Sequence, residues 1–152
     1  MSLASARAVC EGWAEGSERR IVVLHGQSGR GKTKLVSDAT RRLTARTGIP
    51  PRVWSAAALT EYHIDAICRE ELQGLPARCV TGGGALVVEH FEDLVGRSNT
   101  FDMIVRTVSQ LHRAGHPVML TVTRMPPAST QVLRWMRRLR AGGASVIMVP
   151  VP

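Results

Sequence analysis

The stretch that decides the fold is IVVLHGQSGRGKT, residues 21–33. It begins with a short apolar run that is typical of a buried strand, and it ends in a G-x-x-x-x-G-K-T pattern from Gly26 to Thr33, directly before a predicted helix. Glycines in such a loop let backbone N–H groups turn inward around phosphate oxygens, and the following helix presents its positive end to the same anion. The stretch therefore predicts a phosphate-binding loop between a strand and a helix.

Each position of this loop has an expected part in binding a nucleotide. We expect Lys32 to neutralise the β- and γ-phosphates and the Thr33 hydroxyl to ligate Mg²⁺. The remaining residues of the cradle would be Gly26, Gln27, Ser28, Gly29, Arg30 and Gly31. The ligands implied are ATP or ADP with Mg²⁺, but the loop alone does not specify a reaction.

Outside the loop, apolar segments alternate between strand type and helix type, which is the pattern of a parallel sheet with crossover helices. Strands are predicted at residues 21–25, 52–54, 85–89, 118–123 and 145–149. Helices are predicted at residues 3–15, at 32–46, from a cap at Ser55 to Leu72, from a cap at Asn99 to Gly115, and from the prolines at 126 and 127 to Leu139. The expected fold class is α/β, a three-layer αβα P-loop NTPase sandwich forming a single domain over residues 1–152, with ligands at the carboxyl ends of its five parallel strands.

The composition suits one globular domain. The chain has 152 residues, of which 44% are hydrophobic and 21% charged, so wholesale disorder is excluded. The longest purely apolar runs have four residues, whereas a membrane-spanning helix needs about 20, and residues 1–13 do not read as a secretory signal. Three cysteines without close spacing, Cys10, Cys68 and Cys79, fit buried thiols in a reducing compartment. We therefore expect a cytoplasmic protein without membrane contact.

The net charge of +8 is unevenly distributed along the chain. Eight arginines against one acidic residue, Asp102, leave the segment from Arg97 to Pro152 at +7, whereas residues 1–96 carry +1. This Arg-rich C-terminal third could face DNA or another polyanion. Of the 20 basic residues, however, 18 are arginines, and such a bias also arises from a genome that favours arginine codons. The charge alone therefore does not establish DNA binding.

Hydrolysis would require a carboxylate that orients the metal ion and a group that activates water. The predicted strand 85–89 ends in Glu89, where P-loop ATPases usually carry Asp, and this longer side chain still permits a water-mediated contact with Mg²⁺. His90 takes the position that often holds the water-activating acid, and a neutral histidine can accept a proton. A strand-end histidine without a catalytic part is the alternative. Glu92 and Asp93 would substitute only if the chain bends back.

Several segments together resemble the AAA+ ATPase core of the family of bacterial replication initiators that includes DnaA and Hda. The quoted segments are SLASARAVCEGWAEGSERRIVVLHGQSGRGKT (2–33), RVWSAAALTEYHIDAI (52–67), ALVVEHFEDLVGR (85–97), LHRAGHPVMLTVTRMPP (111–127) and LRWMRRLRAGGASVIMV (133–149). The third looks like a Walker B strand with its following loop, and TVTRMPP looks like the sensor 1 region. The Walker A pattern is common to many families, but the ordered set with its paired prolines is more specific.

The resemblance implies an AAA+ core without its helical lid, with strand order 5-1-4-3-2 and ATP as the ligand. It also implies assembly of neighbouring subunits around the nucleotide, through self-association or with another AAA+ protein, and a part in DNA replication. By position, Glu89 would take the metal role of Walker B and His90 the position that follows it. Thr121 or Thr123 would be the polar sensor near the γ-phosphate, the alternative being a locally bonded strand hydroxyl.

The sequence departs from the family pattern at three places. The family's Walker B motif has two consecutive aspartates, and here the pair reads Glu89-His90. The trans-acting arginine finger of the family aligns with Gly142, although Arg138 and Arg140 lie nearby. The sequence ends at Pro152, before the family's helical lid and DNA-binding domain would follow, and both a fragment and a minimal member fit this end. Without the lid we expect a lower nucleotide affinity.

Three functions compete on this basis. The leading hypothesis is an ATP-binding AAA+ core of the DnaA type whose hydrolysis of ATP by itself is weak or absent, which leaves open whether it is an ATPase. The first alternative is a catalytically degenerate P-loop module that binds DNA or protein through the basic helix around Val132 to Arg140. That helix would bury Val132, Met136 and Leu139 and expose Arg134, Arg137 and Arg138. A small-molecule P-loop kinase ranks lower, because the sequence lacks a lid of arginines and an acceptor-binding carboxylate motif.

Overall fold

The computed structural model describes the chain except residues 28, 30, 81, 83, 95–97 and 124–129. Its strands are β1 (Ile21–His25), β2 (Arg52–Ser55), β3 (Leu86–Glu89), β4 (Val118–Val122) and β5 (Val146–Pro150). Its helices are α1 (Leu3–Glu15), α2 (Lys32–Thr47), α3 (Ala56–Cys68), α4 (Leu75–Arg78), the 3₁₀ helix η1 (Phe91–Leu94), α5 (Ser98–Arg113) and α6 (Thr130–Ala141).

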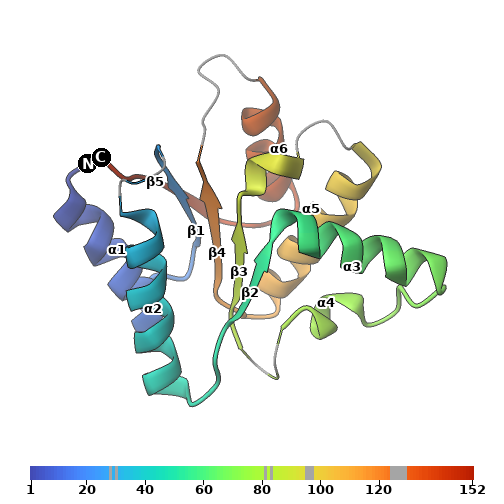
Figure 1. Ribbon diagram of the computed structural model, residues 1–152, viewed down its shortest axis with the longest axis horizontal. Helices are drawn as coiled ribbons and strands as arrows, with labels where there is room; N and C mark the ends of the chain where they lie inside the picture. The colour runs from blue at the N-terminus through green and yellow to red at the C-terminus, as the bar shows by residue number, and fades with distance from the viewer. Residues whose placement is uncertain (28, 30, 81, 83, 95–97, 124–129) are drawn as a thin grey trace.

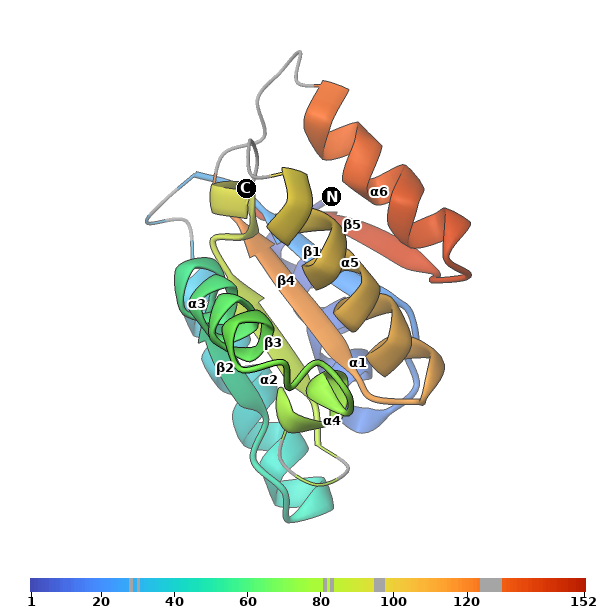
Figure 2. The same cartoon turned by 90° about the vertical axis from the view of Figure 1, so that its right-hand side faces the viewer.

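The strands form one parallel sheet in the order β2-β3-β4-β1-β5. This is the predicted order 5-1-4-3-2 read from the other edge, so the predicted fold class and topology are confirmed. Helices α1 and α2 cover one face of the sheet, and α3 to α6 cover the other (Figure 1, Figure 2). Because every strand runs the same way, the loops that leave the carboxyl ends of the strands gather at one edge.

Alternating strand residues divide the core into two layers. Val22 and Leu24 of β1 pack with the apolar faces of α1 and α2, whereas Ile21 and Val23 pack on the other side with α5. Successive side chains of a strand point to opposite faces, so a strand that is covered on both faces must be apolar at every position. This requirement explains the uninterrupted apolar run of β1, whose first four residues are fully buried.

Local capping signals set the helix boundaries that the sequence predicts well. Ser2 caps α1, since its side chain accepts the backbone N–H of Ser5, and Gly16 closes that helix in the left-handed conformation with φ 86°. Ser55 caps α3 as predicted, and its Oγ accepts the backbone N–H of Ala58 at 3.1 Å. Polar side chains before a helix therefore satisfy backbone donors that the helix itself leaves free.

Two predicted helix boundaries are wrong. Helix α3 ends at Cys68 and not at Leu72, because Glu70 adopts φ 56° and the N–H of Glu71 turns back to the carbonyl of Ala66. This pair of backbone features is a Schellman closure without its usual glycine, which explains why the sequence did not reveal it. Asn99 was the predicted cap of the next helix. Helix α5 already begins at Ser98, so Asn99 lies inside the helix and does not cap it.

The cysteines are free thiols in different settings. Cys10 and Cys79 are buried, and burial raises the pKa of each thiol to about 11, which keeps it protonated at neutral pH. Cys68 is exposed, so the expectation of buried thiols fails at this position. Among the described residues, no helix combines the length and the apolar character that crossing a membrane requires.

A buried histidine joins the two helices α3 and α5. His63 is fully buried, its Nδ1 donates to the carbonyl of Leu59 at 2.8 Å, and its Nε2 accepts the hydroxyl of Thr107 at 2.9 Å. The helical carbonyl can only accept, and this fixes the neutral tautomer with hydrogen on Nδ1. Burial lowers the pKa of His63 below its ordinary value of 6.5, because the charged ring would lose its solvation.

The free energy of unfolding is therefore expected to depend on pH through His63. A folded-state pKa below the unfolded one gives stability that is complete above the unfolded pKa and declines as the pH falls through 6.5. The slope of the unfolding free energy against pH that one such group contributes is at most about 1.4 kcal/mol per pH unit.

Urea unfolding from pH 7.5 to 5 measures this slope, and His63→Gln should reduce it. Since the pKa values of His25 and His112 are also lowered by burial, the difference between the two proteins is the decisive quantity. Equal slopes would contradict the assignment to His63.

Candidate nucleotide-binding site

The candidate site is a cavity at the carboxyl edge of the sheet, where β1 passes through the glycine loop into α2. Its volume is about 660 Å³. The residues that line it come from the loop, the first turns of α2 and the ends of β3 and β4: Gly29, Gly31, Lys32, Thr33, Lys34, Val36, Ser37, Asp38, Arg41, Glu89, His90, Thr121 and Thr123. The fold thus brings the predicted phosphate-binding residues together with the predicted catalytic ones. Ser28 and Arg30 of the predicted cradle lie outside the described residues.

Two loop glycines leave room for an anion. Gly29 and Gly31 adopt φ values of 81° and 96°, in the left-handed region that residues with a side chain rarely occupy. A Cβ added at either glycine would meet no atom of the described chain within 4 Å. Gly26 differs, because an added Cβ would lie 2.6 Å from the carbonyl oxygen of Val151. The first glycine therefore packs the loop against the chain after β5, and the later two shape the open cradle.

Lys32 is the first residue of α2 and is almost completely buried, with 8% of its surface exposed. Its ammonium donates to the carbonyl of Gln27 at 2.8 Å and also to that of Gly26. Burial lowers the pKa of Lys32, and the negative charge of Glu92 partly opposes that shift. The ammonium is thus held by carbonyls of its own loop, in contacts that phosphate oxygens could replace.

Thr33 and Glu89 both line the cavity and offer oxygen ligands for a metal ion. Thr33 is exposed at the start of α2, and Glu89 is half-buried at the end of β3, opposite Ser55 of β2. Hydroxyl and carboxylate oxygens are the ligands that Mg²⁺ prefers, usually with water completing an octahedral shell. The donor set that faces this cavity therefore fits a magnesium ion that also binds phosphate.

A small hydrogen-bonded cluster ties the end of β3 to the end of β4. The N–H of His90 donates to the hydroxyl of Thr121 at 3.2 Å, and Nδ1 of His90 lies 3.2 Å from Oγ1 of Thr123. The N–H of Thr123 donates to Oε1 of Glu92 at 3.0 Å, and that oxygen lies 3.7 Å from Nδ1 of His90. Of the two sensor candidates, Thr121 bonds the neighbouring strand end, and Thr123 is the one that contacts both His90 and Glu92.

Sequence reasoning gave Glu92 a part only if the chain bends back, and the structure contains that bend. His90 has φ 56°, which is unusual for a residue with a side chain, and η1 follows it at once. The turn brings Glu92 under the end of β4, with 16% of its side chain exposed, whereas Asp93 is exposed. A left-handed histidine has no sequence signature, so the pattern alone could not place this carboxylate.

The basic helix α6 is partly engaged with its neighbour α5. Arg138 forms an ion pair with Asp102, and its guanidinium lies 5.8 Å from the ring centre of Phe101. Arg138 is exposed, as predicted, and it also contacts α5. Met136 and Leu139 are buried as predicted. The side chain of Val132 lies outside the described residues. The other arginines of this helix, Arg134, Arg137 and Arg140, are exposed as well.

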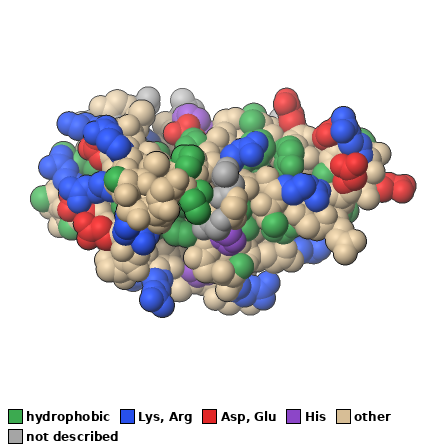
Figure 3. Space-filling view, turned by 90° about the horizontal axis from the view of Figure 1, so that it is seen from below, with side chains coloured by type: hydrophobic (Ala, Val, Ile, Leu, Met, Phe, Trp, Pro, Cys, Tyr) green, Lys and Arg blue, Asp and Glu red, His purple; other side chains and the backbone are tan. Residues whose placement is uncertain are grey.

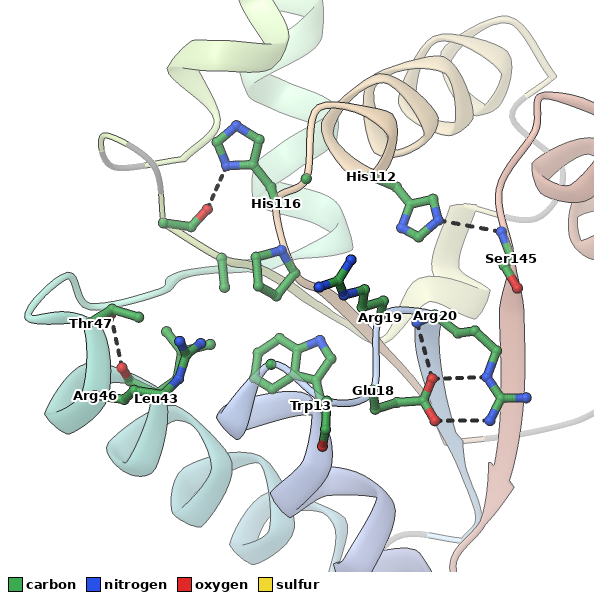
Figure 4. Close-up of a pocket in the computed structure, with 16 residues that line it drawn as sticks. Trp13, Glu18, Arg19, Arg20, Leu43, Arg46, Thr47, His112, His116 and Ser145 are labelled. Carbon is green, nitrogen blue, oxygen red and sulfur yellow. Dashed lines mark hydrogen bonds and ion pairs between the residues drawn. The ribbon is translucent and has the colours of Figure 1, made fainter.

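A second cavity, of about 820 Å³, lies at the opposite edge, where the strands begin. Figure 3 views the molecule from that side and shows Lys and Arg side chains spread over it, with histidines near its middle. Figure 4 shows the charged groups around the cavity, where Glu18 holds Arg20 in a two-bond ion pair and Arg19 extends alongside. Arg46 donates to the carbonyl of Ala14 at the end of α1. This edge contains no part of the glycine loop, so the cavity at the other edge is the candidate nucleotide site.

Known proteins resemble this chain in structure only. No protein-family model and no curated protein matches its sequence. AMPPCP-bound DnaA from Aquifex aeolicus is similar with a TM-score of 0.73 and 20% identity, over 98% of this chain and 45% of that chain. Replication initiator DnaA bound to AMPPCP and single-stranded DNA has a TM-score of 0.71 and 19% identity, over 93% and 44%.

Domain III of the replication initiation protein DnaA from Thermotoga maritima is similar with a TM-score of 0.73 and 16% identity, over 96% of this chain and 61% of that chain. This chain thus spans between 44% and 61% of the length of these DnaA structures. At sequence identities of 16–20%, the structural similarity to these DnaA proteins establishes the fold of this chain alone. The chain has the fold of a DnaA-like AAA+ core, as the resemblance in its sequence predicted.

Proposed function

We propose that this chain binds ATP with Mg²⁺ as an AAA+ core of the DnaA type, and that its hydrolysis of ATP by itself is weak or absent. The observation that carries the proposal is one cavity at the carboxyl edge of the sheet that is lined by Lys32, Thr33, Glu89 and Thr123. Two DnaA structures with the same fold are bound to the ATP analogue AMPPCP. The edge that holds this cavity is also where open parallel sheets bind their ligands.

Each group in the cavity has a defined part in this proposal. The ammonium of Lys32 leaves the carbonyls of Gly26 and Gln27 and binds the β- and γ-phosphates. Gly29 and Gly31 let the loop backbone close around the phosphates. Thr33 and Glu89 would hold Mg²⁺, which when bound neutralises phosphate charge.

Exposed arginines and one neighbouring structure bear on the partners of the chain. One similar DnaA structure is bound to single-stranded DNA, and α6 exposes arginines in its described part. DNA, a second copy of the chain and another AAA+ protein are therefore proposed partners. A cytoplasmic location also remains our prediction.

Isothermal titration calorimetry with Mg-ATP and Mg-ADP tests the proposed function directly. We expect saturable binding of both nucleotides to one site in the micromolar to millimolar range. Phosphate release in the same samples should be slow or undetectable in the isolated chain. A sample that is folded by circular dichroism and binds neither nucleotide at millimolar concentration would refute the proposal.

The magnesium dependence of binding tests the role of Thr33. In the wild-type chain we expect Mg²⁺ to tighten the binding of ATP by about tenfold, because the ion bridges the phosphates and the hydroxyl. Thr33→Ala should lose most of this gain while its affinity for ATP in EDTA stays within about twofold of wild type. Thr33→Ser keeps the hydroxyl and serves as the matched control. Calorimetry with and without Mg²⁺ measures all three proteins, and an undiminished gain in Thr33→Ala would remove Thr33 from the metal site.

A further inference from the structure

The cavity at the amino edge of the sheet, where the strands begin, is lined mainly by basic ionisable groups. Its volume of about 820 Å³ is within the range of small-molecule sites. The ionisable side chains come from the turn after α1, the last turn of α2, the end of α5 and the turn that follows it: Glu18, Arg19, Arg20, Arg46, His112 and His116. Three arginines accompany one acidic residue, so the lining carries positive formal charge.

The acidic residue of this lining already has its partner. The two carboxylate oxygens of Glu18 accept from the guanidinium of Arg20 at 2.8 and 2.9 Å, and the backbone N–H of Arg20 donates to the same carboxylate. The side-chain bonds to Arg20 lower the pKa of Glu18, so the carboxylate stays charged and bound to its arginine. Glu18 and Arg20 form a neutral pair, and the surplus positive charge comes from Arg19 and Arg46.

These two arginines have donors available for a ligand. Arg19 is exposed and forms no hydrogen bond or ion pair with any residue that the structure describes, and Figure 4 shows it extending toward the middle of the lining residues. Arg46 donates through Nε to the carbonyl of Ala14 at 2.9 Å, which leaves its two Nη groups. Guanidinium forks match the oxygens of phosphate groups, so the pair favours a phosphate-bearing anion.

The helix ends at this edge do not favour a cation instead. Helices α1, α2 and α5 all end here, and free carbonyls at a helix C-terminus carry partial negative charge. These carbonyls accept hydrogen bonds from the turns that follow them: Gly12 from Ser17 and Glu18, Thr44 from Gly48, and Leu111 from His116. The carbonyl of Gly84 is likewise occupied, because Nδ1 of His116 donates to it at 2.8 Å. With these acceptors occupied, the cavity favours a ligand that accepts hydrogen bonds.

His112 adds a neutral donor from a third element. Its Nε2 accepts the backbone N–H of Ser145 at 3.4 Å, which places the hydrogen of the neutral ring on Nδ1. Burial lowers the pKa of His112 below its ordinary value of 6.5, so the ring is neutral at pH 7. In Figure 4 its Nε2 points to Ser145, and the rest of the ring lies on the side of Arg19. The Nδ1–H is therefore a donor that adds no charge.

We propose that this cavity is a second ligand site of the chain, which binds the phosphate groups of a small polyanion. Arg19 and Arg46 donate to phosphate oxygens through their forks, and His112 donates through Nδ1–H. A phosphate group offers more acceptor oxygens than a carboxylate, which suits donors that come from three different elements. The site lies at the opposite edge of the sheet from the glycine loop, so it does not require bound nucleotide.

Backbone amide NMR spectra of the isotope-labelled chain test this site, because they show where an anion binds. Inorganic pyrophosphate is the probe, titrated at constant ionic strength. We expect saturable shifts of the amide signals of Arg19, Gly84 and Ser145 with a dissociation constant of about 10 μM to 1 mM. Pyrophosphate that also enters the glycine loop shifts Gly29 and Gly31 with its own midpoint. An amino edge without saturable shifts up to about 10 mM pyrophosphate would overturn the proposal.

Arg19→Gln removes the unpartnered guanidinium from an exposed position. It should weaken pyrophosphate binding at the amino edge by at least about tenfold, because a charge-assisted hydrogen bond is lost. Arg19→Lys keeps the charge without the fork and should lose about threefold. Arg46→Gln should also weaken binding, by at least about threefold, and it serves as the second variant if a thermal melt shows that Arg19→Gln is unstable.

Arg106→Gln is the matched control for Arg19→Gln. It removes the same charge from an exposed side chain of α5 that is not among the residues lining the cavity. Binding at the amino edge should stay within about twofold of wild type. Equal losses in Arg19→Gln and Arg106→Gln would show that the net charge of the chain attracts the anion without a specific site, and the proposal would then be wrong.

Two further probes distinguish the sources of the phosphate group. AMP carries one phosphate on an organic molecule. If AMP saturates the same amide shifts at a lower concentration than pyrophosphate, the site takes an organic phosphate, and the reverse order indicates an inorganic one; either order supports the site. A single-stranded oligonucleotide that shifts these amides when neither small anion does would overturn the proposal, because the ligand would then be a nucleic-acid backbone.

The second site and the proposed nucleotide site can fail separately. Lys32→Ala should remove the pyrophosphate shifts of Gly29 and Gly31 but leave the affinity at Arg19 and Gly84 within about twofold of wild type. A chain that binds Mg-ATP but shows no anion binding at the amino edge refutes only the second site. A chain that binds pyrophosphate at the amino edge but no Mg-ATP refutes only the proposed function.

Discussion

Replacing Lys32 with alanine is expected to weaken Mg-ATP binding by at least about 100-fold, equivalent to about 3 kcal/mol of lost charge-assisted contact. The ammonium is buried at the start of α2 and is held by the carbonyls of Gly26 and Gln27, within reach of the open cradle. Alanine removes the one buried cation among the described residues that line the cavity, so the phosphates would face the loop without a compensating charge. Calorimetry with Mg-ATP measures the loss.

Lys34 provides a matched control two residues along the same helix. It also lines the cavity, but it is exposed, so Lys34→Ala should weaken binding by less than about threefold. These are the only two lysines of the chain, so each variant removes one of its two lysine ammonium groups. Equal losses in the two variants would mean that general positive charge attracts the nucleotide and that Lys32 has no specific contact. The melting temperatures of both variants without nucleotide show whether folding is intact.

Replacing Trp13 with alanine is expected to lower the free energy of unfolding by about 3–5 kcal/mol, a range measured for large aromatic side chains in packed cores. Trp13 is 1% exposed, and it packs with the helices α1 and α2 against β1, β3 and β4. Its indole Nε1 donates to the carbonyl of Val118 at 3.1 Å, 105 positions along the chain. The variant would therefore lose the hydrogen bond that joins α1 to the start of β4. Figure 4 shows Trp13 in the cavity at this edge of the sheet.

Trp13→Phe separates the volume of the ring from its hydrogen bond. Phenylalanine fills most of the space but cannot donate to the Val118 carbonyl, so a loss of about 1–2 kcal/mol is expected. Urea unfolding monitored by circular dichroism measures both variants. Since Trp13 lies at the opposite edge from the glycine loop, the folded Trp13→Phe protein should bind Mg-ATP with unchanged affinity. A change of less than about 1 kcal/mol in Trp13→Ala would show that the packing around α1 relaxes to fill the cavity.

The strands and the main helices could be predicted because local chemistry determines them. The apolar run of β1 has to be a strand that is covered on both faces, and Ser2 and Ser55 are caps whose oxygens satisfy the first donors of a helix. The glycines of the loop likewise allow backbone conformations that other residues avoid. These signals depend on neighbours within a few positions along the chain, so they are visible without the fold.

Other features could not be predicted because they lack the usual residue signal or arise where distant segments meet. The end of α3 at a left-handed Glu70 and the exposure of Cys68 next to it have no local pattern. Arg138 is exposed, as the sequence predicted, but no local pattern shows that α5 brings Asp102 and the ring of Phe101 against it. The closure of α3 uses backbone bonds to the helix's own carbonyls, and it occurs without the glycine that would mark it in the sequence.

What the amino-acid sequence by itself determined about this protein is the phosphate-binding loop and the alternation of strands and helices around it, because both follow from local propensity and from the rule that parallel strands need crossovers. The order of the strands in the sheet was implied by the resemblance to the DnaA family. What only the tertiary structure decided is which residues complete the site. Oε1 of Glu92 reaches Thr123 from 31 positions away, and it does so because His90 accepts a strained turn at the end of β3. The sequence therefore identified the place where the phosphates would lie, and the packing of β3 against β4 selected the carboxylate that lies behind it.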